Sequence, residues 1–354
     1  MFSKALTSVE TIQFNAGAQQ YTINVCSCQE LRITGQGVAN LSGLTQEFVN
    51  DGTISFRNAS TAGSATFTNF ATGLIEFRRT ASAGNAVINN SDLAFVSFLN
   101  NSSAGNATIN LTDNAVVEFS TLSKGGTATI NNSGLGIVAF IDRTTLEDGH
   151  IVNSDSALTI FANQSTAGSA AASITNNGNS VLVFADRSSA GAATITLNDF
   201  ADVEFHNRSS AGSATIVNNS AFGLAFFNQS TAENATITTK GGSFTVFFDR
   251  SNGGQAQFIT EVGGIVDFSG TDGPNKDHKI TAGSFAGAGD YFLGRNELTI
   301  GGNNLSTEVS GTINDGGCSC SAGPASLVKV GTGTRSRCRA SIPIRVRRRS
   351  TPVR

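Results

Sequence analysis

Acidic side chains recur one residue before a regularly spaced phenylalanine, and they are the first candidates for chemistry in this sequence. They are Glu76, Glu118, Glu204 and Asp267. An enzyme that cleaves polysaccharides needs paired carboxylates, or carboxylates with a bound cation and a basic residue, within reach of one another. None of the four acids falls in neighbouring copies of the repeat. We therefore predict no catalytic pair among them.

Two aspartates at turns are the candidates for a cation site. Asp92 and Asp113 take the same place in consecutive copies of the repeat, and two stacked carboxylates could bridge a Ca²⁺ ion. Aspartate is also a common turn residue, because its side chain bonds to the nearby backbone. We favour a solvated turn over a calcium site here.

Arginines recur three residues after the phenylalanine, at Arg143, Arg187, Arg208 and Arg250. Arg187 and Arg208 fall in consecutive copies, so their guanidinium groups could together hold an acidic glycan. Arginines of this kind more often coat a surface and pair with nearby acids. We favour that second interpretation.

Histidine and cysteine show no consistent site. His150, His206 and His278 fall at unrelated positions of the repeat, which gives no support to a catalytic triad. The cysteines are Cys26 and Cys28, Cys318 and Cys320, and Cys338. These C-x-C pairs differ from the usual C-x-x-C spacing of zinc ligands. We predict no catalytic residue, no cofactor-binding residue, no metal site and no cofactor.

The element that must position all these side chains is a repeat marked by phenylalanine. It returns at Phe56, Phe77, Phe98, Phe119, Phe140, Phe161, Phe184, Phe205, Phe226, Phe247 and Phe268, at intervals of 21 residues with one of 23. Mostly Ile, Val or Leu stands two positions earlier, and Asn or Asp often stands two positions later, at Asn58, Asn100, Asp142, Asn163, Asp186, Asn207, Asn228 and Asp249. Period-two alternation predicts a short strand that includes these Asn and Asp residues and has one buried face. The two extra residues fall near Ala170–Ala172 and indicate a small loop insertion.

A second alternating segment follows eleven residues after most of the phenylalanines. It is carried by Phe67, Ile88, Ile109, Ile130, Ile151, Ile174, Ile195, Ile216, Ile237 and Phe258, with alanine two positions earlier in all copies but the one with Gly149. Bulky Phe facing small Ala fits a narrow, densely packed core. Turns are predicted at Gly63, Gly84, Gly105, Gly168, Gly191 and Gly212, and at the Asn-Asn pairs 89–90, 131–132, 176–177 and 218–219.

One strand–turn–strand unit cannot bury its apolar face alone, so successive copies must stack. Parallel strands stack at about 4.8 Å, and eleven coils then span roughly 50 Å. Asn residues at the corners can form ladders that satisfy their buried amides. The alternation excludes an amphipathic helix, and a β-propeller blade needs about 40 residues. We predict an all-β fold, a right-handed parallel β-helix of about eleven 21-residue coils plus flanking coils.

Domain organisation follows the repeat. We predict N-terminal capping coils over 1–44, with a short strand near Tyr21–Val25, the 21-residue solenoid over 45–281 and further coils over 282–334. Residues 335–354 hold eight arginines and no acid, and we predict a disordered basic tail. Without this tail the chain has 15 basic residues against 26 acidic ones, a balance of −11. Only 14% of all residues are charged, and there are 39 Gly, 25 Phe and no Trp, which is unlike an ordinary globular enzyme.

The repeat Phe-x-Asn-x-Ser-x-Ala-Gly-x-Ala-Thr-Ile-x-Asn resembles the passenger domains of bacterial autotransporters of the large repetitive kind, over residues 36–334. Leu305–Ile313 followed by Leu327–Thr334 is similar to the passenger-associated transport repeat of that family. In the family the sequence continues Leu-Thr-Leu-Ser-Gly-x-Asn-Thr-Tyr-x-Gly, and a shifted reading frame of residues 335–354 can encode a close variant of it. We therefore hypothesise that this tail is out of frame; a nucleic-acid or anionic-membrane arm is the alternative.

The resemblance implies a non-enzymatic, surface-displayed passenger stalk with a role in adhesion or surface structure. Its expected partners are host-surface or matrix glycans or proteins, with no nucleic acid and no membrane insertion by this chain, which we expect to be monomeric. The expected location is the cell surface or the extracellular space. The family's export signal and outer-membrane barrel are not recognised in this sequence, so we expect a fragment or an interrupted gene. The alternative function is a β-helical polysaccharide lyase or hydrolase.

Overall fold

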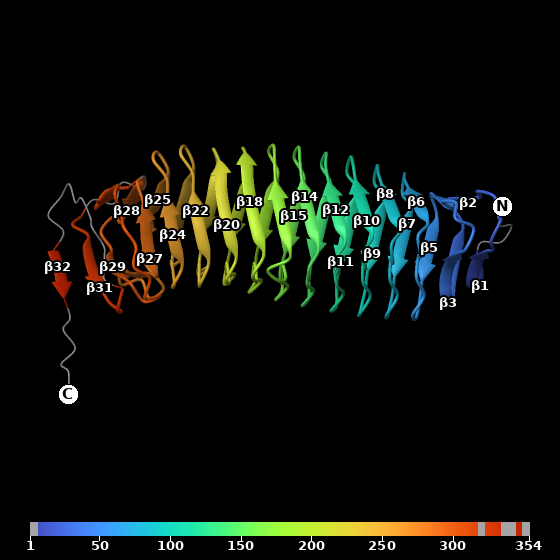
Figure 1. Ribbon diagram of the computed structural model, residues 1–354, viewed down its shortest axis with the longest axis horizontal. Helices are drawn as coiled ribbons and strands as arrows, with labels where there is room; N and C mark the ends of the chain where they lie inside the picture. The colour runs from blue at the N-terminus through green and yellow to red at the C-terminus, as the bar shows by residue number, and fades with distance from the viewer. Residues whose placement is uncertain (1–5, 318–322, 334–344, 349–354) are drawn as a thin grey trace, which may run out of the picture. The chain divides into compact units, whose positions relative to one another are not determined.

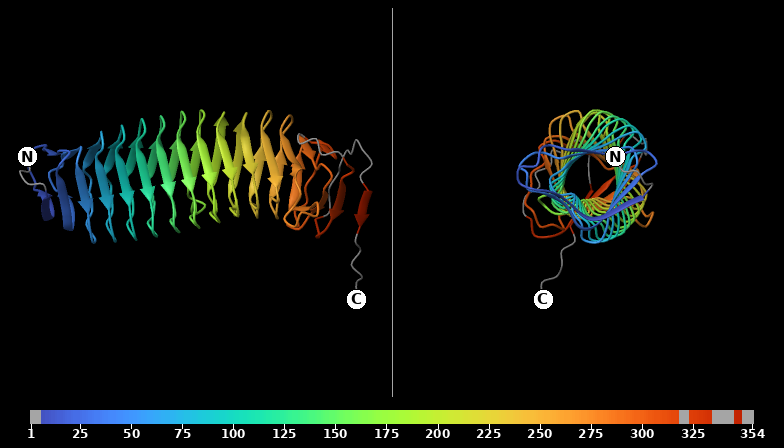
Figure 2. Two further views of the ribbon diagram at one scale, coloured as in Figure 1. Left: turned by 180° about the vertical axis from the view of Figure 1, so that it is seen from behind. Right: turned by 90° about the vertical axis from the view of Figure 1, so that its right-hand side faces the viewer.

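The chain folds as a parallel β-solenoid, as the repeat predicts. The computed structural model describes residues 6–317 and 323–333, and the backbone of 345–348. All regular elements in these ranges are β-strands. Two compact units divide the chain, residues 1–174 and 175–354, and in each the strands of successive coils lie side by side (Figure 1, Figure 2).

Two parallel sheets run through the first unit. The phenylalanine sheet, which carries the recurring Phe, contains β1 (Leu6–Phe14), β3 (Glu30–Asn40), β5 (Thr53–Phe56), β7 (Leu74–Phe77), β9 (Phe95–Phe98), β11 (Val116–Phe119), β13 (Ile137–Phe140) and β15 (Leu158–Phe161). The isoleucine sheet contains β2 (Thr22–Val25), β4 (Glu47–Asn50), β6 (Thr66–Asn69), β8 (Val87–Asn90), β10 (Thr108–Leu111), β12 (Thr129–Asn132) and β14 (His150–Asn153), and β16 (Ser173–Asn176) crosses the unit boundary. The short strand predicted near Tyr21–Val25 is confirmed as β2.

The same two sheets recur in the second unit, together with a third. The phenylalanine sheet contains β17 (Val181–Phe184), β19 (Asp202–Phe205), β21 (Gly223–Phe226), β23 (Phe244–Asp249), β25 (Ile265–Thr271), β28 (Asp290–Phe292) and β30 (Thr312–Asn314). The isoleucine sheet contains β18 (Thr194–Asp199), β20 (Thr215–Ser220), β22 (Thr236–Thr239), β24 (Gln257–Thr260) and β27 (Ser284–Gly287). The third sheet contains β26 (Lys279–Ala282), β29 (Glu297–Ile300), β31 (Ser326–Lys329) and β32 (Arg345–Arg348).

Phenylalanine stacking holds successive coils in one register. Phe119 pairs with Phe98 on one side and Phe140 on the other in the strand ladders. The ring centroids are 4.6 Å and 4.3 Å apart, with the planes within 6° and 3° of parallel. Every Phe of the repeat is buried, as are the Ile and Ala positions of the second strand. The predicted core is therefore confirmed.

Each coil turns at three corners, and each corner holds a residue with positive φ. In the coil after Phe98 these are Asn100 (φ 64°), Gly105 (φ 62°) and Asp113 (φ 57°). The prediction that Asn and Asp two positions after Phe belong to the strand is confirmed for Asp249, which ends β23, and wrong for the others, whose strands end at the Phe. Asn and Asp are favoured there because they tolerate the left-handed region better than other residues with a Cβ.

Three of the four predicted Asn-Asn turns are also wrong, since Asn218 and Asn219 lie inside β20 as well. Asn89–Asn90 and Asn131–Asn132 end β8 and β12, and the second Asn of each pair is buried. The predicted Asn ladder lies at these inward positions: Asn50 Nδ2 donates to Asn69 Oδ1 over 2.7 Å, and Asn69 Nδ2 donates to Asn90 Oδ1 over 2.8 Å. Leu111 then interrupts the ladder.

Two segments depart from the regular coils, the insertion near residue 170 and the C-terminal tail. Residues 169–171 form an exposed turn before β16, which confirms the predicted loop insertion. Of the predicted disordered tail, only the backbone of β32 lies within the described residues, and it pairs in parallel with β31. Cys318, Cys320 and Cys338 lie outside the described residues.

Candidate functional site

An open hollow of about 390 Å³ lies on the corners that follow β17, β19 and β21 in the second unit. Its lining residues stand two and three positions after the Phe of each coil: Asp186, Arg187, Asn207, Arg208, Asn228 and Gln229. The in-register pairing of Phe184 with Phe205, and of Phe205 with Phe226, brings these corners together. Arg187 and Arg208, which stand in consecutive copies of the repeat, therefore line the same hollow.

One wall of the hollow is a line of hydrogen-bonded corner residues. Asp186, Asn207 and Asn228 have φ values of 50°, 59° and 55°. Asn207 Nδ2 donates to Asp186 Oδ1 over 2.6 Å, and the Asn207 backbone N–H donates to Asn228 Oδ1 over 3.1 Å. The backbone N–H of Asn228 donates to Asp249 Oδ2 over 2.9 Å. These bonds engage the short polar side chains and leave the longer Arg and Gln side chains to face solvent.

Arg187 and Arg208 are exposed, as predicted, but the predicted pairing with nearby acids is not seen. Neither side chain makes an ion pair or hydrogen bond with another described residue. Arg250, at the same repeat position, donates to the Pro274 carbonyl oxygen from Nε over 2.9 Å. Arg143, in the first unit, is also exposed. The hollow therefore presents two guanidinium groups whose donors are open to a ligand.

A second cluster lies on the outer face of the phenylalanine sheet, along β19. Asp202, Glu204 and His206 alternate with buried residues and so project from one face. Glu204 Oε2 lies 2.7 Å from His206 Nε2. Burial of Asp202, and then the negative charge of Glu204, raise the pKa of Asp202 from 3.8 to about 6, against the opposing influence of the Val203 backbone hydrogen bond and His206.

The sequence predictions missed this cluster. The predicted candidate pairs are acids stacked between coils, whereas Asp202 and Glu204 share one strand at a spacing of two. That spacing was visible in the sequence and was enough to place both carboxylates on one face. The neighbouring strands add rings: His206 stacks on Phe227 at 4.8 Å, and Phe227 stacks on Phe248 at 5.2 Å.

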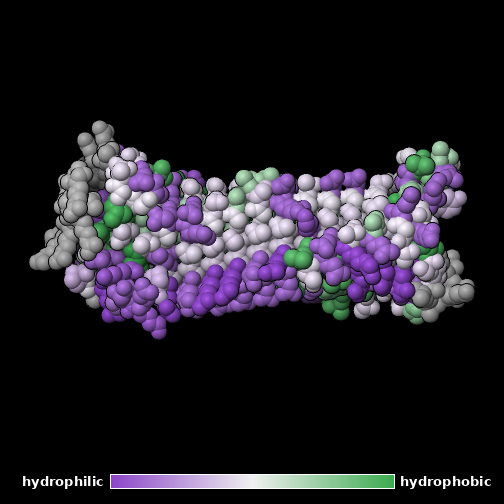
Figure 3. Space-filling view, turned by 90° about the horizontal axis from the view of Figure 1, so that it is seen from below, coloured by the Kyte–Doolittle hydropathy of each residue, from purple (hydrophilic) through white to green (hydrophobic). Residues whose placement is uncertain are grey.

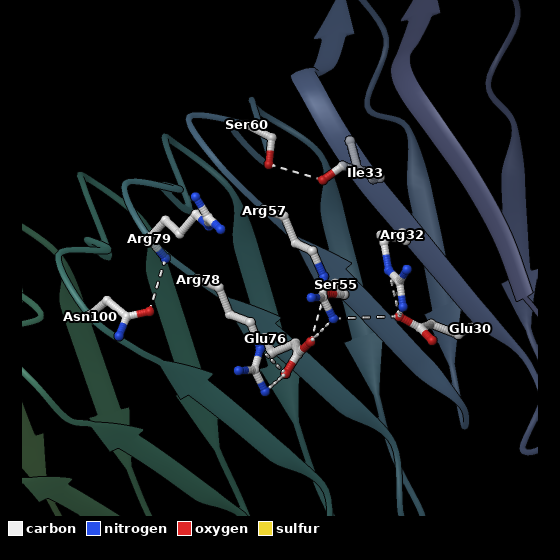
Figure 4. Close-up of polar contacts among 10 residues, drawn as sticks. All are labelled: Glu30, Arg32, Ile33, Ser55, Arg57, Ser60, Glu76, Arg78, Arg79 and Asn100. Carbon is white, nitrogen blue, oxygen red and sulfur yellow. Dashed lines mark hydrogen bonds and ion pairs between the residues drawn. The ribbon is translucent and has the colours of Figure 1, made fainter.

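Glu76, the first of the predicted outward acids, is engaged in a polar network in the first unit. Ser55 Oγ donates to Glu76 Oε1 over 2.6 Å, and Arg57 Nη2 lies 3.2 Å from the same oxygen. Arg78 Nε donates to Glu76 Oε2 over 2.7 Å. Figure 4 shows both arginines directed at the carboxylate, and the Glu76 side chain is only 7% exposed. A carboxylate held this way positions the arginines and is not open to a substrate.

The other predicted acids have different surroundings. Glu118 is half-buried on β11, and Asp267 is buried on β25, where its Oδ1 accepts the Ser269 backbone N–H over 2.7 Å. Neither lies on a coil next to another of the four acids. The structure therefore does not bring these acids together.

Asp92 and Asp113 cap turns of the neighbouring coil. Asp92 Oδ2 accepts the Ala71 backbone N–H over 2.9 Å, and Asp113 Oδ2 accepts the Asp92 backbone N–H over 3.4 Å. These contacts agree with the turn interpretation that we favoured. Within the part of the chain that the structure describes, no group of three His, Cys, Asp or Glu side chains could hold a metal ion.

The histidines and the first cysteine pair stand apart from one another. His150 Nδ1 lies 2.8 Å from Ser173 Oγ, and His278 Nδ1 lies 3.3 Å from Asp272 Oδ1. Cys26 and Cys28 are exposed and free. These residues form no common site among the described residues.

The hydropathy of the surface varies in bands along the face seen in Figure 3. On the face drawn in Figure 3, hydrophilic residues gather into bands, and pale residues of intermediate hydropathy fill the area between them. The described residues include no helix that could cross a membrane.

No protein-family model, curated protein or solved structure matches the chain.

Proposed function

We propose that this chain is a non-enzymatic, surface-displayed stalk of the autotransporter passenger type, with a role in adhesion or surface structure. The proposal rests on the resemblance of the repeat to that family. The structural observation that supports it best is the constant register of the coils from β7 to β15: Leu74, Phe95, Val116, Ile137 and Leu158 pair in sequence along one sheet of the first unit.

Such a register suits a load-bearing element. Each internal strand bonds to a parallel strand on both sides, and identical side chains stack above one another. Buried amides also bond from coil to coil in the ladder from Asn50 through Asn69 to Asn90. The Glu76 carboxylate is likewise engaged, by Ser55, Arg57 and Arg78. A scaffold built this way displays its corners at fixed intervals.

Surface display in a bacterial host tests the proposal. The full chain is placed between an export signal and an autotransporter β-barrel, and protease sensitivity of intact cells reports its exposure. We expect display of a folded chain and retention of the cells on immobilised matrix glycans or proteins. A Phe119→Asp variant, which places a charge in the Phe ladder, serves as the misfolded control. Displayed, folded protein that gives no retention on any surface would contradict the adhesion role.

The alternative is a polysaccharide-active enzyme, and one observation favours it. Asp202 and Glu204 project from one strand, and a carboxyl with a pKa of about 6 suits a general acid near neutral pH. Release of reducing ends or unsaturated sugars from a polysaccharide panel would measure such activity. Activity that is lost in Asp202→Asn and Glu204→Gln variants, and kept in Glu118→Gln, would replace the stalk by an enzyme.

A further inference from the structure

Two adjacent arginines without an acid partner mark the hollow on the corners after β17, β19 and β21. Like charges on neighbouring strands or corners repel, and this arrangement is unfavourable unless an anion lies between them. The one carboxylate in the lining, that of Asp186, already accepts the Asn207 amide over 2.6 Å. The hollow therefore holds two positive charges against one negative charge that is already hydrogen-bonded.

The corners that carry these two charges repeat with the coil. Arg187 and Arg208 follow Phe184 and Phe205, which are register partners on adjacent parallel strands, and such strands repeat at about 4.8 Å. A sugar unit in an extended polysaccharide has a similar length. A chain with an anionic group on successive sugars, lying across the coils, can present one group to each guanidinium. Guanidinium binds both carboxylate and sulfate through two parallel hydrogen bonds.

The remaining lining suits sugar hydroxyls. The Gln229 side chain makes no hydrogen bond with another described residue, so its amide can both donate and accept. No aromatic side chain lines the hollow, whereas single-stranded nucleic acid is usually held by aromatic stacking as well as by charge. The lining thus favours a polysaccharide over a nucleic acid.

We propose that this hollow binds a linear anionic polysaccharide, with Arg187 and Arg208 each engaging an anionic group and Gln229 a hydroxyl. The inference deepens the proposed adhesion role, on which it rests, by naming the class of ligand. It does not depend on any catalytic step.

Other copies of the repeat carry glutamine at the position of these arginines, so Arg→Gln variants should keep the fold. Arg187 has a φ of 68°, and Gln164 occupies the same repeat position with the same φ of 68°, so Arg187→Gln should fold normally. Arg208→Gln repeats the residue that Gln229 provides one coil further on. Arg143→Gln is the matched control. Arg143 holds the same repeat position as Arg187, but the coils before and after it carry Leu122 and Gln164 there, so no second arginine stands next to it.

Calorimetric titration of the full chain tests the proposal. The probes are oligogalacturonate, which is carboxylated, dextran sulfate, neutral dextran and poly-glutamate. We expect one or both anionic polysaccharides to bind, the Arg187→Gln/Arg208→Gln double variant to bind at least tenfold more weakly, and Arg143→Gln to stay within twofold. Which anionic polysaccharide binds decides between a carboxylated and a sulfated ligand.

Three results would overturn the inference: no binding of either anionic polysaccharide, equal binding by the double variant, or equal binding of poly-glutamate, which would mean a generic polyanion only. Circular dichroism of each variant confirms folding. Surface display of the double variant separates the two proposals, because display should be unchanged when the hollow is lost. A failure of display with the wild-type chain would instead count against the stalk.

Discussion

Replacing Asp202 by Asn should stabilise the second unit near neutral pH. The carboxyl of Asp202 has a pKa of about 6 in the folded chain against 3.8 as the ordinary value. A raised folded-state pKa means that the proton is bound more tightly in the folded chain. The stabilisation that this proton provides is complete below about pH 4 and is lost as the pH rises through about 6. Asn has nearly the same shape and no charge to bury.

The magnitude follows from the shift. A change of about two pKa units corresponds to about 3 kcal/mol, and partial exposure of the side chain screens this to about 1–2 kcal/mol. We therefore expect Asp202→Asn to raise the local free energy of unfolding by about 1–2 kcal/mol at pH 8 and by almost nothing at pH 4.

Hydrogen exchange of the β19 amides measures this local free energy, because stability varies along a solenoid and one global value would mix both units. Glu118→Gln is the control, since it removes an outward carboxylate at the same repeat position as Glu204 in the first unit. The reasoning fails if the Asp202→Asn variant is no more stable than wild type at pH 8, or if its gain is the same at pH 4.

Three further substitutions and one control test the ladders and the corners. Phe119→Ala removes a ring that stacks on Phe98 at 4.6 Å and on Phe140 at 4.3 Å, and leaves a void between them. We expect the free energy of unfolding to fall by about 3–5 kcal/mol, as measured by urea unfolding monitored by circular dichroism. Asn69→Leu removes the oxygen that accepts from Asn50 Nδ2 over 2.7 Å. Thermal unfolding should show a loss of about 1–3 kcal/mol, although Leu is the native residue at this position one coil beyond Asn90. An unchanged midpoint would contradict the ladder argument. Gly105→Ala would bring a Cβ within 2.8 Å of the Gly84 carbonyl oxygen at a φ of 62°, so we expect more than about 1 kcal/mol of destabilisation, whereas Ser213→Ala on an exposed corner should be neutral within about 0.5 kcal/mol.

The fold could be predicted because its signal is redundant. Phe, Ile and Ala recur at fixed places, and only parallel in-register stacking lets each of them meet its own copy. The corners were harder to predict, because Asn occupies three different structural positions in this chain. Asn100 adopts positive φ at a corner, Asn90 is buried at a strand end, and Asn89 points outward beside it. Alternation alone does not distinguish a strand residue from the first residue of a turn.

The candidate sites were predicted in part. The stacking of Arg187 and Arg208 follows from the repeat, but their lack of acid partners depends on where side chains of other coils reach. Asp202 was missed because the pattern that mattered ran along a strand and not between strands. Its raised pKa comes from burial, which a sequence does not show directly.

Identical register between coils makes the length of this solenoid easy to change. Removing residues 99–119 would join Phe98 directly to Ser120, and β9 would then meet β13 with the same partners that β11 has now. Because each coil touches only its neighbours, the loss or duplication of one 21-residue segment in the gene would leave every other coil unaltered. Gain or loss of a whole 21-residue repeat would therefore yield longer and shorter folded variants in a single step.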